Sequence, residues 1–166
     1  MLAKPASPPP INQWLDEYTS SHLNPVNKAI HWLCIPPIVF SVFGLLRALP
    51  WGGDLVNGGT IAAVLAVAYY LSLSWRLAFG AAGVFALMYW GVEASYEGLG
   101  RLHVPAMIAV FVLAWIGQFI GHQVEGAKPS FFKDLQFLLI GPLWLLAWIY
   151  RRLGLRITGS ASTAQA

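Results

Sequence analysis

Three of the four histidines lie in polar stretches at the edges of strongly apolar segments. His22 and His31 belong to the stretch 21–31, and His122 belongs to the stretch 118–126. Imidazole is the commonest side-chain ligand of transition metals, and an ionisable group beside a membrane-like segment is a functional candidate by default. The sequence therefore predicts a metal site, on the condition that the two stretches meet.

Helical spacing places a polar neighbour beside His31. On a helix that begins near Pro25, Asn27 and His31 are four residues apart and share one face. His22 lies just before this helix, so it could fold back over the first turn. An amide next to an imidazole is typical of the groups that orient metal-binding histidines.

His122 has similar neighbours. Gln118, His122 and Glu125 are spaced as i, i+4 and i+7, which places them on one face at the end of an apolar segment. Together with the first stretch they offer three imidazoles, one carboxylate and two amides. This set resembles in type the site of two histidines and one carboxylate that binds Fe(II) and leaves coordination positions open.

The predicted site therefore has four metal ligands and two supporting cofactor-binding amides: His22, His31, His122 and Glu125, with Asn27 and Gln118. A plainer interpretation also stays open. Any single histidine could be a hydrogen-bonding residue at the membrane interface, and Glu125, close to Lys128, could be a solvated carboxylate.

The composition indicates an integral membrane protein. Of the 166 residues, 57% are hydrophobic and only 10% are charged, whereas a soluble domain carries about 25% charged residues. The basic residues behind the net charge of +3 are mostly isolated, which gives nucleic-acid binding little support. The single cysteine, Cys34, excludes internal disulfides and cysteine-rich metal sites and is expected to pack in the core. Four histidines are too few for a histidine-box di-iron hydroxylase.

The sequence predicts an all-α membrane bundle. Five apolar segments, which suit four or five transmembrane or re-entrant helices, lie at about 30–49, 59–75, 77–92, 104–121 and 135–150. Pro142 interrupts the last of them, so that this segment could be kinked, partial or re-entrant. Before them, residues 11–21 have apolar side chains at helical spacing and predict a short amphipathic helix on the membrane surface.

The predicted domain organisation is simple. One membrane-embedded helical domain would cover residues 11–153. A proline-rich leader at 1–10 and a small, polar tail at 154–166 are expected to be disordered.

The order of the segments indicates which polar groups share an end of the bundle. If all five segments cross, the first begins on the membrane face where the fourth ends, which brings His22 and His31 to the same face as His122. His103 starts the fourth segment on the opposite face and is expected to be an ordinary interfacial residue. The polar stretch 93–101 on that face is expected to be a solvated loop.

Two signatures resemble those of a known family. The first comprises Glu17-Tyr18, residues 22–31 and Ile35-Pro36, and the second comprises residues 115–122, Glu125 and Lys128-Pro129. In this order and separation they are similar to the Mpo-type 2-hydroxy fatty acid dioxygenases. These are small multi-pass membrane proteins with a characterised fungal member in the endoplasmic reticulum. The resemblance covers residues 11–145.

The resemblance implies an Fe(II)-dependent dioxygenase of fatty acid α-oxidation. Such an enzyme uses O2, without 2-oxoglutarate, to shorten a long-chain 2-hydroxy fatty acid by one carbon. Carried over to this sequence, the iron ligands are His22, His31 and His122, and Glu125 is a ligand or lies next to them. The substrate's alkyl chain would lie among the apolar helices, in contact with membrane lipid.

Two other functions stay open at this point. The chain could be a non-catalytic membrane protein that binds lipid or a partner and uses its histidines structurally. It could also be a haem protein with His31 and His122 as axial ligands. The expected location is a bacterial inner membrane, or the endoplasmic reticulum in a eukaryote.

Overall fold

The structure is a computed structural model that describes residues 11–126 and 136–158. In chain order its elements are α1 (Ile11–Ser20), α2 (Pro25–Arg47), α3 (Gly58–Leu73), α4 (Trp75–Leu99), the 3-10 helix η1 (Gly100–Leu102), α5 (His103–Glu125) and α6 (Gln136–Arg152). All the elements in the described residues are helices, and the β-pairing there is limited to an isolated bridge between Gly52 and Asn57. This confirms the predicted all-α class. The predicted leader and most of the predicted tail lie outside the described residues.

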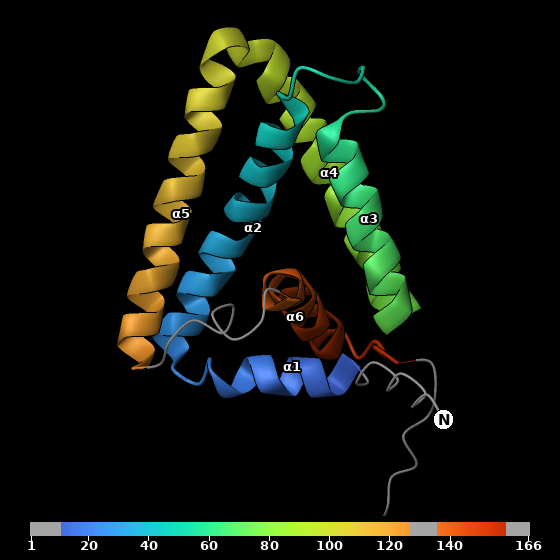
Figure 1. The fold of residues 1–166 in the computed structure, drawn as a ribbon. Coiled ribbons are helices and arrows are strands. Elements are labelled where there is room, and N and C mark those ends of the chain that lie inside the picture. The colour runs from blue at the N-terminus through green and yellow to red at the C-terminus, as the bar shows by residue number, and fades with distance from the viewer. Residues whose placement is uncertain (1–10, 127–135, 159–166) are drawn as a thin grey trace, which may run out of the picture.

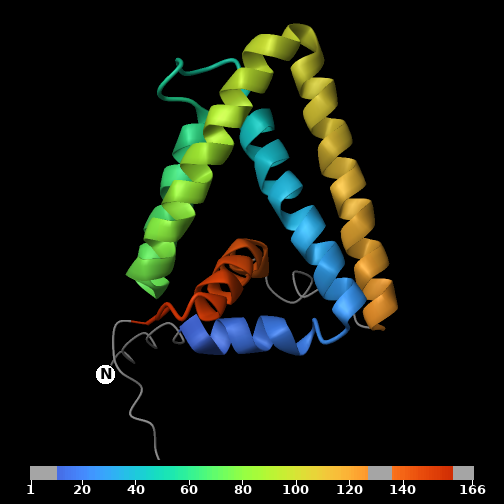
Figure 2. The same ribbon diagram turned by 180° about the vertical axis from the view of Figure 1, so that it is seen from behind.

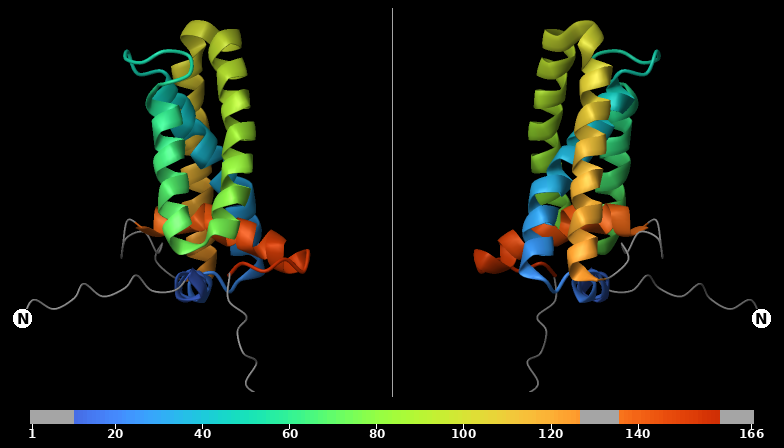
Figure 3. Two further views of the ribbon diagram at one scale, coloured as in Figure 1. Left: turned by 90° about the vertical axis from the view of Figure 1, so that its right-hand side faces the viewer. Right: turned by 90° about the vertical axis from the view of Figure 1, so that its left-hand side faces the viewer.

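The helices form two arms and a base (Figure 1). α2 and α5 pack side by side in the first arm, and α3 and α4 pack side by side in the second. The arms converge where α4 turns through η1 into α5, while α1 and α6 lie across the open end (Figure 2). Seen from the side, the four arm helices run roughly parallel to one another and the base helices cross them (Figure 3).

α5 approaches α2 closely because glycines face the contact. A Cβ at Gly117 would lie 2.6 Å from the sulfur of Cys34, and a Cβ at Gly121 would collide with the side chain of Asn27. Small residues spaced four apart allow two helices to pack nearly backbone to backbone. This contact places the last turn of α5 beside the first turn of α2. Cys34 is buried in it, as predicted.

Both of these helix ends are fixed by local sequence. The side chain of Asn24 accepts a hydrogen bond from the Val26 amide at 2.9 Å, and Pro25 occupies the first helical position. α5 is followed by Gly126, whose left-handed φ of 72° lets the chain turn away. The start of α2 and the end of α5 therefore meet at a defined register.

α1 is the predicted amphipathic helix. Its buried residues are Ile11, Leu15 and Tyr18, and it packs against α6. The indole of Trp144 in α6 donates a hydrogen bond to the hydroxyl of Thr19 at 2.9 Å. The two base helices are thus joined by an apolar face and a polar contact.

The second arm is a helical hairpin formed by the predicted apolar segments 59–75 and 77–92. Ser74 separates α3 from α4, and its hydroxyl accepts a hydrogen bond from the Leu77 amide at 3.3 Å. The expected loop at 93–101 is wrong, because α4 continues to Leu99. The polar residues there have partners inside the bundle: Glu93 accepts a hydrogen bond from Arg47 at 2.7 Å.

Among residues 11–126 and 136–158, two helical stretches are long and apolar enough to cross a membrane. They are Pro25–Arg47 and Trp75–Glu125, the second of which includes the turn at η1. α3 is apolar but shorter. α6, the fifth predicted segment, contains Pro142 and lies across the base instead of beside the arm helices (Figure 1).

Candidate metal centre

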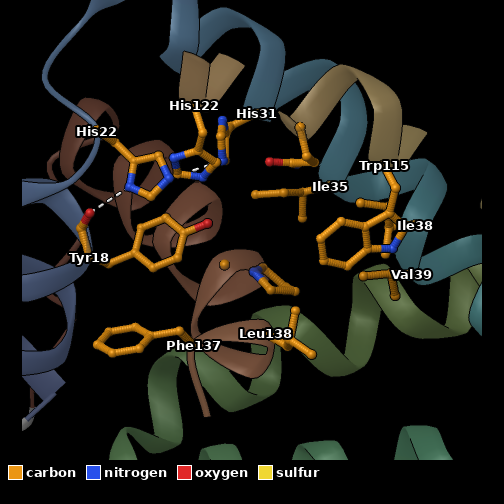
Figure 4. A pocket seen from close by; sticks show the side chains of 13 residues that line it. Tyr18, His22, His31, Ile35, Ile38, Val39, Trp115, His122, Phe137 and Leu138 are labelled. Carbon is orange, nitrogen blue, oxygen red and sulfur yellow. Dashed lines mark hydrogen bonds between the residues drawn. The ribbon is translucent and has the colours of Figure 1, made fainter. Parts of the chain in front are cut away.

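His22, His31 and His122 meet at the base of the first arm. One ring nitrogen from each lies within 4.8 Å of the others, and the three side chains are 0%, 1% and 6% exposed. His22 comes from the turn after α1, His31 from α2 and His122 from the last turn of α5. Figure 4 shows the three imidazoles gathered at one end of a pocket.

Backbone carbonyls fix the tautomers of two of these imidazoles. The Nδ1–H of His22 donates to the carbonyl of Tyr18 at 2.6 Å, and the Nδ1–H of His31 donates to the carbonyl of Asn27 at 2.9 Å. Because a carbonyl only accepts hydrogen bonds, each Nδ1 must carry the proton. In the neutral rings both Nε2 atoms therefore present lone pairs.

These two lone pairs point at each other. The Nε2 atoms of His22 and His31 are 2.9 Å apart in a buried site, where two acceptors repel unless a cation or a proton lies between them. Nitrogens bound about 2.1 Å from one ion, at about 90° to each other, are separated by about 3 Å. The observed separation therefore suits two adjacent ligands of a six-coordinate metal.

His122 completes the donor set. Its Nδ1 is buried and has no hydrogen-bond partner among the described residues. An unpartnered buried nitrogen costs free energy, which a bound metal would recover. Three neutral imidazoles suit iron, zinc, copper or nickel and leave further coordination positions open.

The protonation state of His22 is also that of a ligand. Burial lowers the pKa of His22 to about 4, although its hydrogen bond to the Tyr18 carbonyl favours the charged form. The imidazole is therefore neutral at physiological pH, which is the form that binds metal.

Glu125 lies beside the three histidines and holds the chain that carries His22. Its Oε1 accepts hydrogen bonds from the Leu23 and Asn24 amides at 2.8 and 3.1 Å, and its Oε2 accepts one from the Asn24 amide at 2.9 Å. The side-chain amide of Asn27 donates to the same Oε2 at 2.9 Å. A carboxylate here also stabilises the N-terminus of α2. Direct metal ligation by Glu125 stays a prediction.

The two predicted supporting amides have different surroundings. Asn27 supports the site through its carbonyl, which holds His31, and through its side chain, which holds Glu125. Gln118 lines the pocket and is 6% exposed. The structure therefore brings all six predicted site residues to one end of the first arm.

His103 is at the other end of α5, as the segment order predicted. Its position at the membrane interface stays a prediction, and its side chain is 1% exposed. Its Nε2 donates to the carbonyl of Gly44 at 3.0 Å, and its Nδ1 lies 3.2 Å from the hydroxyl of Ser95. The polar partners of His103 come from α2 and α4, which the linear sequence does not place beside it.

The pocket next to the histidines is small and mostly apolar. Its cavity has a volume of about 60 Å³, and its apolar walls come from α2, α5 and α6. Since one water needs about 10–15 Å³ of cavity, this volume can hold a few waters or a small polar group. Figure 4 places Ile38, Val39 and Trp115 at the end away from the histidines.

A family model described as 2-hydroxy-palmitic acid dioxygenase Mpo1-like matches residues 9–153. The chain belongs to the Mpo1-like family. A relative from Saccharomyces cerevisiae, the 2-hydroxy-palmitic acid dioxygenase MPO1, is 28% identical over 141 residues, which cover 82% of this chain and 78% of the relative. No solved structure matches the chain.

In this Mpo1-like chain, sequence reasoning missed the role of the aromatic residues around His22. The ring of Tyr18 stacks on the imidazole with centroids 4.2 Å apart and planes 7° apart, and Trp144 lies 5.7 Å away. The spacing of four residues between Tyr18 and His22 is the one signal that could have found the first contact. The contact with Trp144 depends on α6 crossing the base.

Proposed function

We propose that this chain is an Fe(II)-dependent dioxygenase that converts a long-chain 2-hydroxy fatty acid into the fatty acid one carbon shorter. The observation that carries the proposal is the pair of facing Nε2 atoms, held in one tautomer at the end of an apolar pocket. Membership of the Mpo1-like family and the name of the yeast relative support the substrate class.

The ligands in this proposal are His22, His31 and His122. An iron ion held by them would supply a redox-active, Lewis-acidic centre with open coordination positions. The Tyr18 and Asn27 carbonyls keep two of the imidazoles in the binding tautomer, so the ligands need little reorganisation. Glu125 keeps the turn with His22 against α5.

The remaining residues of the pocket bind the substrate and exclude water. The head group would occupy the cavity beside the histidines, and the alkyl chain would extend past Ile38 and Trp115. The overall reaction balances when one 2-hydroxy acid and one dioxygen give one shortened fatty acid, one carbon dioxide and one water. We further propose that the arm helices span a membrane, so that the substrate enters from the lipid.

The haem alternative fits the geometry poorly. The His31 and His122 rings are 4.9 Å apart, with His22 packed against both, and the adjoining cavity of about 60 Å³ cannot hold a porphyrin. A colourless purified protein that binds iron would agree with this assignment, whereas a Soret band would contradict it.

The test is oxygen consumption by purified protein loaded anaerobically with Fe(II), on addition of a long-chain 2-hydroxy fatty acid. We expect iron-dependent uptake and a product one carbon shorter by mass spectrometry. His31→Ala should abolish both while the far-ultraviolet circular dichroism stays helical. His103→Ala is the matched control and should retain uptake. Iron-loaded wild-type protein without uptake would refute the proposal.

A further inference from the structure

Tyr18 has a hydroxyl for which the described part of the fold provides no hydrogen-bond partner. The side chain is 6% exposed and lines the cavity beside the three histidines. No residue among 11–126 and 136–158 forms a hydrogen bond with this hydroxyl. Phenylalanine would make the same apolar contacts, so the hydroxyl adds only a hydrogen-bonding group. This group is available to a ligand in the cavity.

The ring of Tyr18 is held so that its hydroxyl faces the cavity. It lies parallel to the His22 imidazole at 4.2 Å and also contacts Phe137 at 6.2 Å and Trp144 at 5.3 Å. Figure 4 shows the hydroxyl directed towards the middle of the pocket. Because the ring rests on a candidate ligand, the hydroxyl has a fixed position relative to the proposed metal.

The neighbouring helix leaves space at this hydroxyl. A Cβ on Gly141 of α6 would lie 3.2 Å from the Tyr18 oxygen. This is a tight contact for a carbon, so the glycine keeps the approach to the hydroxyl open. Gly141 itself lines the same cavity.

The cavity also needs a neutral donor. Among the described residues that line it, none is a lysine or an arginine, although the proposed substrate carries a carboxylate. The neutral donors are Tyr18, Gln118 and Trp115, and Trp115 lies at the apolar end (Figure 4). A phenol is protonated at neutral pH and donates readily to an anion. Tyr18 is the donor packed directly against a candidate ligand.

We propose that the Tyr18 hydroxyl donates a hydrogen bond to the carboxylate of the bound 2-hydroxy acid, and so selects acids over uncharged amphiphiles. This inference rests on the proposed function, because it takes the three histidines as the metal site and the 2-hydroxy acid as its ligand. It adds a residue that touches the substrate without binding the metal.

The test measures binding without turnover. Wild-type protein and Tyr18→Phe are loaded with Zn²⁺, and their affinities for 2-hydroxyhexadecanoic acid and for hexadecane-1,2-diol are measured by calorimetry in the same detergent. Tyr18→Phe should retain zinc, bind the acid about tenfold to hundredfold more weakly, and bind the diol as the wild type does. Tyr150→Phe is the matched control, because its hydroxyl bonds to the Arg76 carbonyl, outside the pocket, and should bind the acid normally.

Gly141→Ala provides a second test of the same hydrogen bond, again by acid affinity. The added methyl group should weaken acid binding in the wild type and have no further effect in Tyr18→Phe, where the crowded oxygen is gone. Unchanged acid affinity in zinc-loaded Tyr18→Phe would overturn the inference alone. Loss of zinc in Tyr18→Phe would also overturn it, because the hydroxyl would then serve the metal site. A zinc-loaded wild type that binds no acid would instead contradict the proposed function.

Discussion

The two ends of the first arm each bury histidine, but they use its nitrogens differently. At one end both nitrogens of His103 have protein partners, the Gly44 carbonyl and the Ser95 hydroxyl. At the other end His22 and His31 each give one nitrogen to a backbone carbonyl and turn the other towards the second histidine. The histidines are buried at both ends, so burial does not distinguish them. A histidine with protein partners for both ring nitrogens is structural, whereas one with a carbonyl on Nδ1 and another imidazole at Nε2 is a candidate metal ligand.

The carboxylates at the two ends differ in the same way. Glu93 forms an ion pair with Arg47, at 2.7 Å, so its charge is balanced by a cation. Glu125 binds backbone and side-chain amides at the start of α2. The first contact joins two arm helices, whereas the second fixes the turn that carries His22.

The largest expected effect separates the two kinds of histidine. His22→Gln should lower the affinity for Fe(II) or Zn²⁺ by more than about hundredfold, because it removes one of three imidazoles. His103→Gln should bind metal as the wild type does. Metal content after gel filtration, measured by mass spectrometry, checks both variants. Equal metal loss in the two variants would contradict the assignment of His22 as a ligand and of His103 as a structural residue.

The next effect concerns the two carboxylates. Glu125→Gln replaces one acceptor oxygen with an NH2 group, which must face amide donors of the turn or Asn27. We expect metal affinity to fall about tenfold to hundredfold, because the turn with His22 is no longer held. Glu93→Gln is the matched control and should change stability but leave metal affinity intact. The measurement is competitive titration with a chelator, and wild-type affinity in Glu125→Gln would contradict the role given to the carboxylate.

A smaller effect is expected at the helix contact that brings the histidines together. Gly117→Ala should destabilise the fold by about 1–3 kcal/mol, because its methyl group would press on the sulfur of Cys34. Gly83→Ala, where nothing lies within 4 Å of the added carbon, should be neutral or stabilising by up to about 1 kcal/mol. Thermal unfolding in detergent checks the pair, and an equally tolerated Gly117→Ala would argue against close packing of α2 and α5.

The smallest effect is expected for removal of the structural imidazole. His103→Leu should cost about 1 kcal/mol, because it loses a hydrogen bond to a carbonyl that also accepts from the Ala48 amide. Its metal content should stay at the wild-type level. Thermal unfolding with a parallel metal assay measures both quantities, and loss of metal would show that the two ends of the arm are coupled.

Much of the site could be predicted from the sequence because its signals are local. The spacing of Asn27 and His31, the cap at Asn24 and the proline at the helix start define the beginning of α2. The order of apolar segments then indicates that His122 reaches the same end and that His103 does not. The sequence does not predict the helix at 93–99, because the partners of its polar residues, such as Arg47, lie on another helix.

The sequence by itself determined the all-α class, the capped start of α2 and the end of the bundle at which each polar stretch lies, because capping and periodicity act over a few residues. The tertiary structure decided which polar side chains face one another. The hold of Glu125 on the turn with His22 depends on the packing of α5 against α2. The 2.9 Å approach of His22 to His31 and the position of the Tyr18 hydroxyl also depend on where α1 and α6 lie at the base. Such contacts join residues far apart in sequence, so packing geometry alone sets their distances and the partners of each nitrogen and oxygen.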